Sequence, residues 1–164
     1  MINPIYENKL IKLYQGDCLE IMPQLNIAFD ACITDPPYGC LNKSNQSSKW
    51  DFVIDLNKMW KCLSNITNKN TPIILFGSGI FSAQLILSNS CQYKYSLIWN
   101  KQRTTGFLNA NKMPLRCHED ILVFYEKLPT YNPQMRKCLP HQKNHSRGHG
   151  KNITNRCYGE FKNI

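Results

Sequence analysis

The segment that most constrains the fold of this chain is an apolar run that stops at an acid and two prolines. The run spans residues 29–34 and is followed by Asp35-Pro36-Pro37-Tyr38-Gly39. Each proline fixes its own φ and removes a backbone donor, and the residue before a proline is pushed toward extended geometry. The pattern therefore predicts a buried strand that ends in a rigid, exposed turn.

The turn carries groups that suit recognition of a flat molecule bearing an exocyclic amine. Because prolines provide no N–H groups, the carbonyls of the turn are expected to remain free as acceptors. The Asp35 carboxylate and a turn carbonyl can accept hydrogen bonds from an amine, while the Tyr38 ring can stack on the flat face. The residues that provide these groups are Asp35, Pro36, Pro37 and Tyr38.

The turn, extended by Thr34 and Gly39, resembles the catalytic motif of the S-adenosylmethionine-dependent DNA amino-methyltransferases, which methylate adenine N6 or cytosine N4. Five further segments resemble segments of the permuted, beta-like class of this family, in the same order. They are residues 13–20 upstream and residues 98–101, 105–110, 118–125 and 131–134 downstream. Several motifs in order are more specific than a single one.

The resemblance implies a Rossmann-like methyltransferase fold with S-adenosyl-L-methionine (SAM) as cofactor. A Phe-Gly-Ser-Gly segment at residues 76–79 resembles the family's cofactor loop, but permuted members carry a different turn at this place, and a lone Gly-x-Gly is weak evidence. The family's later His-Pro-Thr-Gln-Lys-Pro-like segment and Phe-x-Gly-x-Gly loop have no counterpart, so the chain is expected to be truncated before its cofactor-binding glycine motif. The implied cofactor contacts are Asp17, Cys18, Asp35, Phe76 and Gly77.

The implied function is site-specific transfer of a methyl group from SAM to the exocyclic amine of a base flipped out of DNA, as in restriction–modification systems. Asp35 at the first position of the motif favours adenine N6. Cytosine N4 is an alternative acceptor, and a truncated remnant that binds DNA without catalysis is another reading. Direct transfer needs no metal and no covalent intermediate.

Positive charge is concentrated in two parts of this chain, whose net charge is +9. Residues 131–164 hold seven Lys or Arg and one acid, which suits phosphate contact, although a disordered solvated tail has the same composition. A second basic group surrounds Phe107 and suits a loop that grips the backbone around an extruded base. The predicted DNA contacts are Lys101, Arg103, Asn109, Lys112, Arg116, Arg136 and Lys137.

Strand and helix patterns alternate along the chain. This alternation predicts an α/β fold, a mostly parallel twisted sheet with helices on both faces. Ligands of such sheets bind beyond the carboxyl ends of strands, where Asp17 and Asp35 are expected to lie. The polar residues 39–50 are expected to form a loop over the site. Strands are predicted at residues 10–15, 30–34, 72–76, 93–99 and 120–125, and helices after Asp17 and at residues 55–66 and 80–87.

Residues 1–130 are expected to form a partial catalytic domain, and residues 131–164 the basic start of a target-recognition region. No apolar stretch approaches the roughly 18 residues needed to span a bilayer, and the N-terminus lacks the pattern of a secretory signal. A cytoplasmic protein is therefore expected. The expected partner is double-stranded DNA, together with a second copy or a separate chain that supplies the missing cofactor-binding half.

Eight cysteines are scattered without any Cys-x-x-Cys pair. Most are expected to be reduced thiols in the core, because a free thiol behaves as a small hydrophobe and no export signal favours disulfides. One cluster has histidines four residues apart, which would suit a zinc site on a helix, but the prolines and glycines within it favour a solvated basic loop. No metal is therefore predicted at this cluster, which comprises Cys138, His141, His145, His149 and Cys157.

Overall fold

The computed structural model describes residues 2–41 and 49–135. The chain divides into two units, residues 1–130 and 131–164, and every helix and strand named below belongs to the first. The predicted roles of these two units remain predictions. Within the described ranges, no helix is long and apolar enough to cross a membrane.

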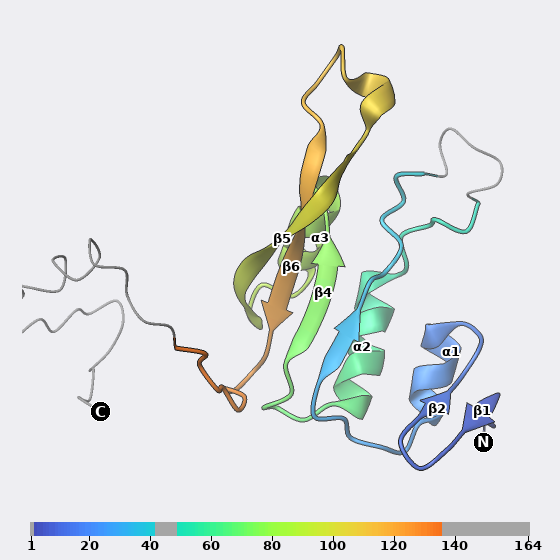
Figure 1. Ribbon diagram of the computed structural model, residues 1–164. Helices are drawn as coiled ribbons and strands as arrows, with labels where there is room; N and C mark the ends of the chain where they lie inside the picture. Colours follow the sequence, from blue (N-terminus) through green and yellow to red (C-terminus); the bar gives the residue numbers. More distant parts are fainter. Residues whose placement is uncertain (1, 42–48, 136–164) are drawn as a thin grey trace, which may run out of the picture. The chain divides into compact units, whose positions relative to one another are not determined.

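A four-stranded mixed sheet forms the centre of the first unit (Figure 1). β3 and β4 are parallel, and β6 runs antiparallel to both of its neighbours, so three of the four strands share one direction. The predicted α/β fold is confirmed. In spatial order the strands are β3 (Cys32–Thr34), β4 (Ile73–Gly77), β6 (Arg116–Phe124) and β5 (Tyr93–Thr105).

The helices α2 (Leu56–Ile66) and α3 (Ile80–Ser88) provide most of the core that supports the sheet. The Asp55 carboxylate caps the first by accepting a hydrogen bond from the Lys58 amide at 3.1 Å. Apolar residues at helical spacing then face the sheet. The two helices predicted at residues 55–66 and 80–87 are confirmed, and their buried contacts are Met59, Leu63, Ile66, Phe81 and Leu85 with Leu75, Leu122 and Phe124.

Both helices lie on the same face of the sheet, so the prediction of helices on both faces is wrong for the described residues. Strand alternation points Leu75 and its register partner Leu122 toward the helices. The crossovers from β3 to β4 and from β4 to β5 advance in the same direction across the sheet. Right-handed crossovers that advance in one direction place their helices on one side.

The opposite side of the sheet, here called the open face, is apolar. Ile33 is 67% exposed and Leu97 is 53% exposed, whereas Val123 is buried by its neighbours. No described helix covers this face. By register Glu119, the partner of Trp99, also lies on this face, and the apolar residues of the face are Ile33, Ile74, Phe76, Tyr95, Leu97, Trp99, Ile121 and Val123.

β5 and β6 form a long hairpin whose outer part rises above the end of β4 (Figure 1). Pairing extends from Tyr93–Phe124 to Thr105–Arg116, with a register irregularity between Asn100 and Thr105. The 3-10 helix η3 (Phe107–Asn109) forms the tip. The prediction of short strands joined by a long loop is wrong here. Side chains on both sides of this two-stranded ribbon are exposed, so its sequence lacks the alternation of apolar and polar residues that predicts a strand.

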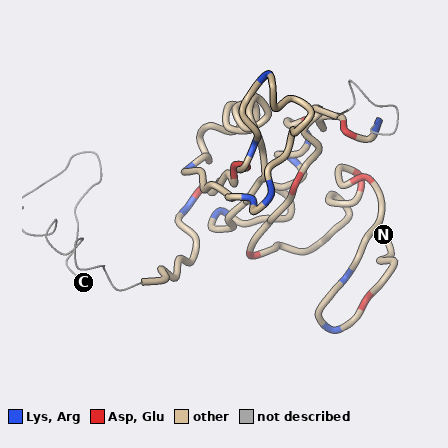
Figure 2. Tube along the Cα trace, turned by 45° about the horizontal axis from the view of Figure 1, so that its top comes forward, with Lys and Arg blue, Asp and Glu red and all other residues tan. Residues whose placement is uncertain are grey.

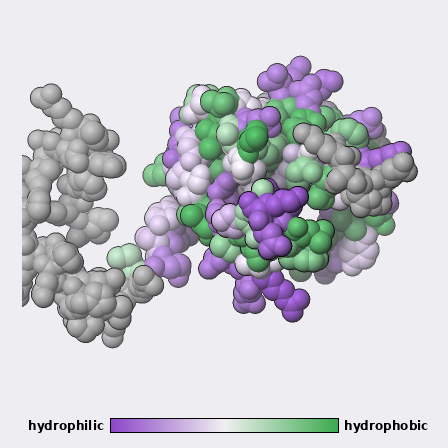
Figure 3. Space-filling view, turned by 90° about the horizontal axis from the view of Figure 1, so that it is seen from above, coloured by the Kyte–Doolittle hydropathy of each residue, from purple (hydrophilic) through white to green (hydrophobic). Residues whose placement is uncertain are grey.

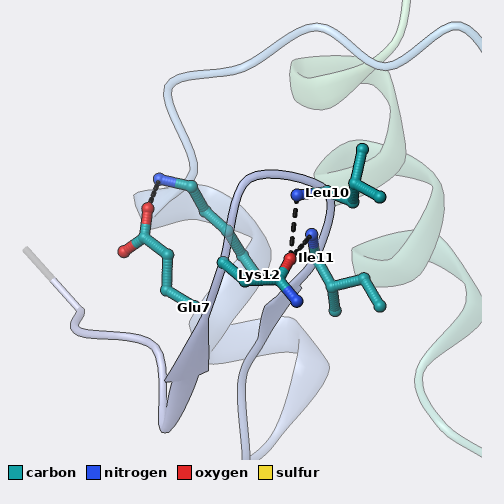
Figure 4. A network of polar contacts seen from close by, with 5 residues as sticks. Glu7, Leu10, Ile11 and Lys12 are labelled. Atoms are coloured by element: carbon teal, nitrogen blue, oxygen red, sulfur yellow. Dashed lines mark hydrogen bonds and ion pairs between the residues drawn. The ribbon is translucent and has the colours of Figure 1, made fainter.

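The N-terminal strands β1 (Tyr6–Glu7) and β2 (Lys12–Leu13) form a separate antiparallel pair. At their turn the Asn8 side chain accepts hydrogen bonds from the Leu10 and Ile11 amides, and an ion pair joins the two strands (Figure 4). The strand predicted at residues 10–15 is therefore shorter than expected and lies outside the four-stranded sheet.

A short helical segment follows, made of α1 (Cys18–Ile21) and η1 (Met22–Gln24). The helix predicted after Asp17 is confirmed, and the Asp17 side chain caps it by accepting a hydrogen bond from the Leu19 amide at 2.8 Å. Pro23 stands at the start of η1, where its missing N–H costs no hydrogen bond.

The described cysteines are free thiols, but few of them lie in the core. Cys62 is buried and Cys32 is half-buried, whereas four others are exposed, so the prediction of mostly buried thiols is wrong for this part of the chain. The Cys/His cluster at residues 138–157 lies outside the described residues. Among those that are described, no three potential ligands gather as a metal site.

Candidate functional site

The Asp-Pro-Pro-Tyr turn begins directly where β3 ends. Thr34 is the register partner of Leu75, so the turn starts beside the carboxyl end of β4. Asp35 is exposed and Pro36 is buried. No backbone amide of the described residues donates to the Pro36 carbonyl, which leaves this oxygen available as an acceptor.

A buried carboxylate holds the chain where it leaves the turn. Asp51 is 2% exposed and accepts hydrogen bonds from the amides of Gly39 at 2.9 Å and Leu41 at 2.6 Å. The hydrogen bond from Leu41 is the main cause that lowers the pKa of Asp51, against the opposing effect of burial. Sequence reasoning missed this residue; an acid between Trp50 and Phe52 was the available signal.

A cavity of about 580 Å³ lies beside the turn, within the size range of small-molecule sites. It brings together the turn, the loop between β4 and α3, and one residue of the hairpin. Seen from above, this end of the unit shows hydrophobic and hydrophilic residues side by side (Figure 3). Its lining comprises Tyr38, Gly39, Cys40, Val53, Ser78, Gly79, Ile80, Phe81, Gln84 and Arg116.

Tyr38 is stacked within the protein. Its ring lies nearly parallel to that of Phe81, with centroids 5.1 Å apart and an interplanar angle of 25°. Its hydroxyl is buried and has no hydrogen-bond partner in the described structure. Burial, followed by the influence of the Asp35 carboxylate, raises the pKa of Tyr38, so its hydroxyl stays protonated. Stacking of Tyr38 on a substrate base remains a prediction.

The segment at residues 76–79 joins β4 to α3, but only its second half reaches the cavity. Phe76 packs edge-on against Trp99, with ring centroids 5.7 Å apart, and Gly77 is buried against α3. Ser78 and Gly79 line the cavity. The cofactor contacts predicted for Phe76 and Gly77 therefore remain predictions.

Gly77→Ala is expected to destabilise the fold by about 1–3 kcal/mol, because the added methyl overpacks the contact with α3. A Cβ at this position would lie 2.9 Å from Ser82 Oγ and 3.3 Å from Ser82 Cα. Ser82 cannot turn away freely, since its hydroxyl donates to Asp120 at 2.6 Å. Urea unfolding monitored by circular dichroism measures the change.

Gly79→Ala separates backbone strain from crowding. Gly79 has a φ of +59° and a ψ of −126°, a backbone conformation that only glycine adopts readily, but open space surrounds its Cβ position. Its substitution is therefore expected to cost about 1–3 kcal/mol through backbone strain alone, without crowding. A Gly77→Ala variant as stable as the wild type would contradict the close packing described above.

Asp17 and Cys18 do not line the cavity. The Asp17 carboxylate is engaged as the cap of α1. Burial, followed by the charge of Asp17, raises the pKa of the Cys18 thiol. The structure therefore does not bring these two residues into one described cavity with the motif turn, and their predicted contact with the cofactor remains a prediction.

Figure 2 marks the described Lys and Arg positions in blue along the trace. The predicted DNA contacts of the hairpin differ in their surroundings. Lys101 forms an ion pair with Glu119 and lies 5.2 Å from the centroid of the Trp99 ring. Arg103, Asn109 and Lys112 are exposed, and Arg116 is the hairpin residue that lines the cavity. Arg136 and Lys137 lie outside the described residues.

A second cavity, of about 520 Å³, lies near Ile73, at the opposite end of β4. Its lining is largely polar and includes Asn68, Thr71 and Glu126. None of the predicted catalytic, cofactor or DNA contacts lies in it. The cavity beside the motif turn is therefore the candidate active site.

Comparison with known proteins finds similarity in structure. No protein-family model and no curated protein sequence matches this chain. Two crystal structures of M1.HpyAVI match it at 21% identity over 77% of this chain: the complex with SAM, with a TM-score of 0.54, and M1.HpyAVI, with a TM-score of 0.53. The chain spans 63% and 62% of their lengths, respectively. At this identity the likeness concerns the fold, and the chain shares the α/β fold of M1.HpyAVI.

Proposed function

We propose that this chain transfers a methyl group from SAM to the exocyclic amine of a base flipped out of double-stranded DNA in the cytoplasm, with adenine N6 as the acceptor. One observation carries the proposal. The Asp35–Tyr38 turn stands at the carboxyl end of β3, beside a cavity, in a fold shared with M1.HpyAVI, which is solved in complex with SAM.

The turn has the groups that this reaction requires. The Asp35 carboxylate and the Pro36 carbonyl accept hydrogen bonds from the amine, which directs the nitrogen lone pair toward the methyl donor. The Tyr38 ring is already stacked on Phe81, so a flipped base extends an existing stack. Catalysis then consists of positioning and electrostatic stabilisation.

The cavity also fits a nucleoside-sized ligand. Gly79 lines it and has open space where a Cβ would stand, so a ligand can approach the backbone closely. When bound, SAM supplies an electrophilic methyl group on a sulfonium ion. The residues that the family resemblance implies for holding it are Asp17, Cys18, Asp35, Phe76 and Gly77, which lie outside the lining of this cavity.

Incubation of the purified chain with tritiated SAM and unmethylated plasmid DNA tests the proposal. Label in the DNA is expected, with N6-methyladenine as the product in mass spectra of the hydrolysed nucleosides. N4-methylcytosine would support the alternative acceptor. A folded chain that leaves no label in DNA would contradict methyl transfer by this chain alone.

Tyr38→Ala is expected to weaken binding of a flipped base by about 5- to 150-fold, the range given by the loss of one base–aromatic stack. Binding of SAM, measured by calorimetry, should change less. Tyr38→Phe is the control, because it keeps the ring and removes only the hydroxyl that lacks a partner. Equal losses of base and SAM binding in the Ala variant would argue against stacking.

A second candidate function is DNA binding without methyl transfer by the isolated chain. It is favoured by the open face and by the position of Asp17 and Cys18 outside the cavity. A second copy or a separate chain would then complete the cofactor-binding half. Salt-sensitive DNA binding without SAM binding would support this function, and SAM binding by the chain alone would contradict it.

A further inference from the structure

The tip of the β5–β6 hairpin holds two apolar side chains in solvent. Phe107 is 76% exposed and Leu108 is 82% exposed. The tip is an ordered turn, because the Asn109 amide donates to the Gly106 carbonyl at 2.9 Å and the Ala110 amide donates to the Phe107 carbonyl at 3.0 Å. Two large apolar groups are thus displayed on a defined backbone.

All the charged residues in the outer part of the hairpin are basic. Residues 102–117 contain Arg103, Lys112 and Arg116 and no acid. Lys101, which lies closer to the centre of the sheet, is neutralised by Glu119. The charge that surrounds the apolar tip is therefore complementary to a polyanion.

The hairpin also connects its tip to the candidate active site. Arg116 lines the cavity and is the register partner of Thr105, which precedes the turn at Gly106. When a DNA duplex lies along the β5–β6 hairpin, one part of the duplex is beside the cavity and another part is beside the tip. The two apolar side chains then meet DNA close to the base that is extruded.

We propose that Phe107 and Leu108 form a wedge that enters the base stack next to the target base, while Arg103 and Lys112 hold the phosphates on either side. Apolar side chains that insert between base steps unstack them and kink or unwind the duplex. The inference rests on the proposed function, because extruding a base from a duplex requires such unstacking.

Relaxation of plasmid DNA by a topoisomerase in the presence of the full chain tests the wedge without knowledge of the recognition sequence. The wild type is expected to change the linking number of the plasmid. Phe107→Ala/Leu108→Ala should abolish that change and weaken plasmid binding by about tenfold, with an unchanged salt slope. Lys112→Ala should instead lower the salt slope by about one.

Leu87→Ala is the matched control, since Leu87 is a comparably exposed apolar residue, 78% exposed, that belongs to α3 and not to the hairpin. The wedge is overturned if wild-type protein leaves the linking number unchanged, or if the double variant changes it as the wild type does. A different set of results would show that the proposed function fails while the wedge is correct. In that case the wild type unwinds the plasmid and the double variant does not, but no methyl group reaches the DNA.

Discussion

Asp35→Ala is expected to lower the rate of methyl transfer by about 100- to 1,000-fold, the usual effect of removing one preorganised hydrogen-bonding group from a transition state. The substitution removes the carboxylate that accepts from the amine. It should hardly affect folding, because Asp35 is exposed and is not part of the core. Initial rates with tritiated SAM and plasmid DNA measure the loss.

Asp30→Ala is the control for this variant, since Asp30 is an exposed acid that precedes β3. Its transfer rate should match that of the wild type. Retained wild-type turnover in Asp35→Ala would remove the amine-acceptor role and, with it, the mechanism proposed for the turn.

Asp51→Ala is expected to reduce the free energy of unfolding by about 3 kcal/mol, because two backbone amides lose the buried charged acceptor that they now share. The variant loses the hydrogen bonds from Gly39 and Leu41 together. Urea unfolding at neutral pH measures the change. A loss below about 0.5 kcal/mol, typical of a surface substitution, would show that this carboxylate does not hold the turn.

The pH dependence of stability provides a second readout of Asp51. Its pKa is lower in the folded chain than the ordinary value of 3.8. Its contribution is therefore fully present above that value and is lost as the pH falls below it and through the folded pKa. Asp51→Asn cannot titrate, so it should remove this part of the acid sensitivity while preserving the shape of the side chain.

The elements predicted best from the sequence are those whose burial produces a regular pattern of apolar residues. α2 repeats apolar residues at helical spacing and begins with a capping acid, and both signals are local. β3 and β4 are apolar runs that end in turn-forming residues. The Asp-Pro-Pro-Tyr turn could likewise be placed at the end of β3, because two prolines restrict the backbone whatever surrounds them.

The features that could not be predicted depend on contacts between distant residues. Asp51 is twelve positions from Gly39, and nothing in the polar stretch between them shows that they meet. The side on which each helix packs follows from the order of the strands, which the sequence does not display. The outer hairpin is exposed on both sides, so its strands lack the alternation by which strands are recognised.

The open face also affects how the free energy of unfolding depends on temperature. Side chains such as Ile33 and Leu97 stay largely hydrated in the folded unit, so they add little to the apolar area that unfolding exposes. The heat capacity change of unfolding scales with that area. This unit should therefore have a flatter stability curve than a domain whose sheet is covered on both faces, and a partner that covers the open face would make the curve steeper.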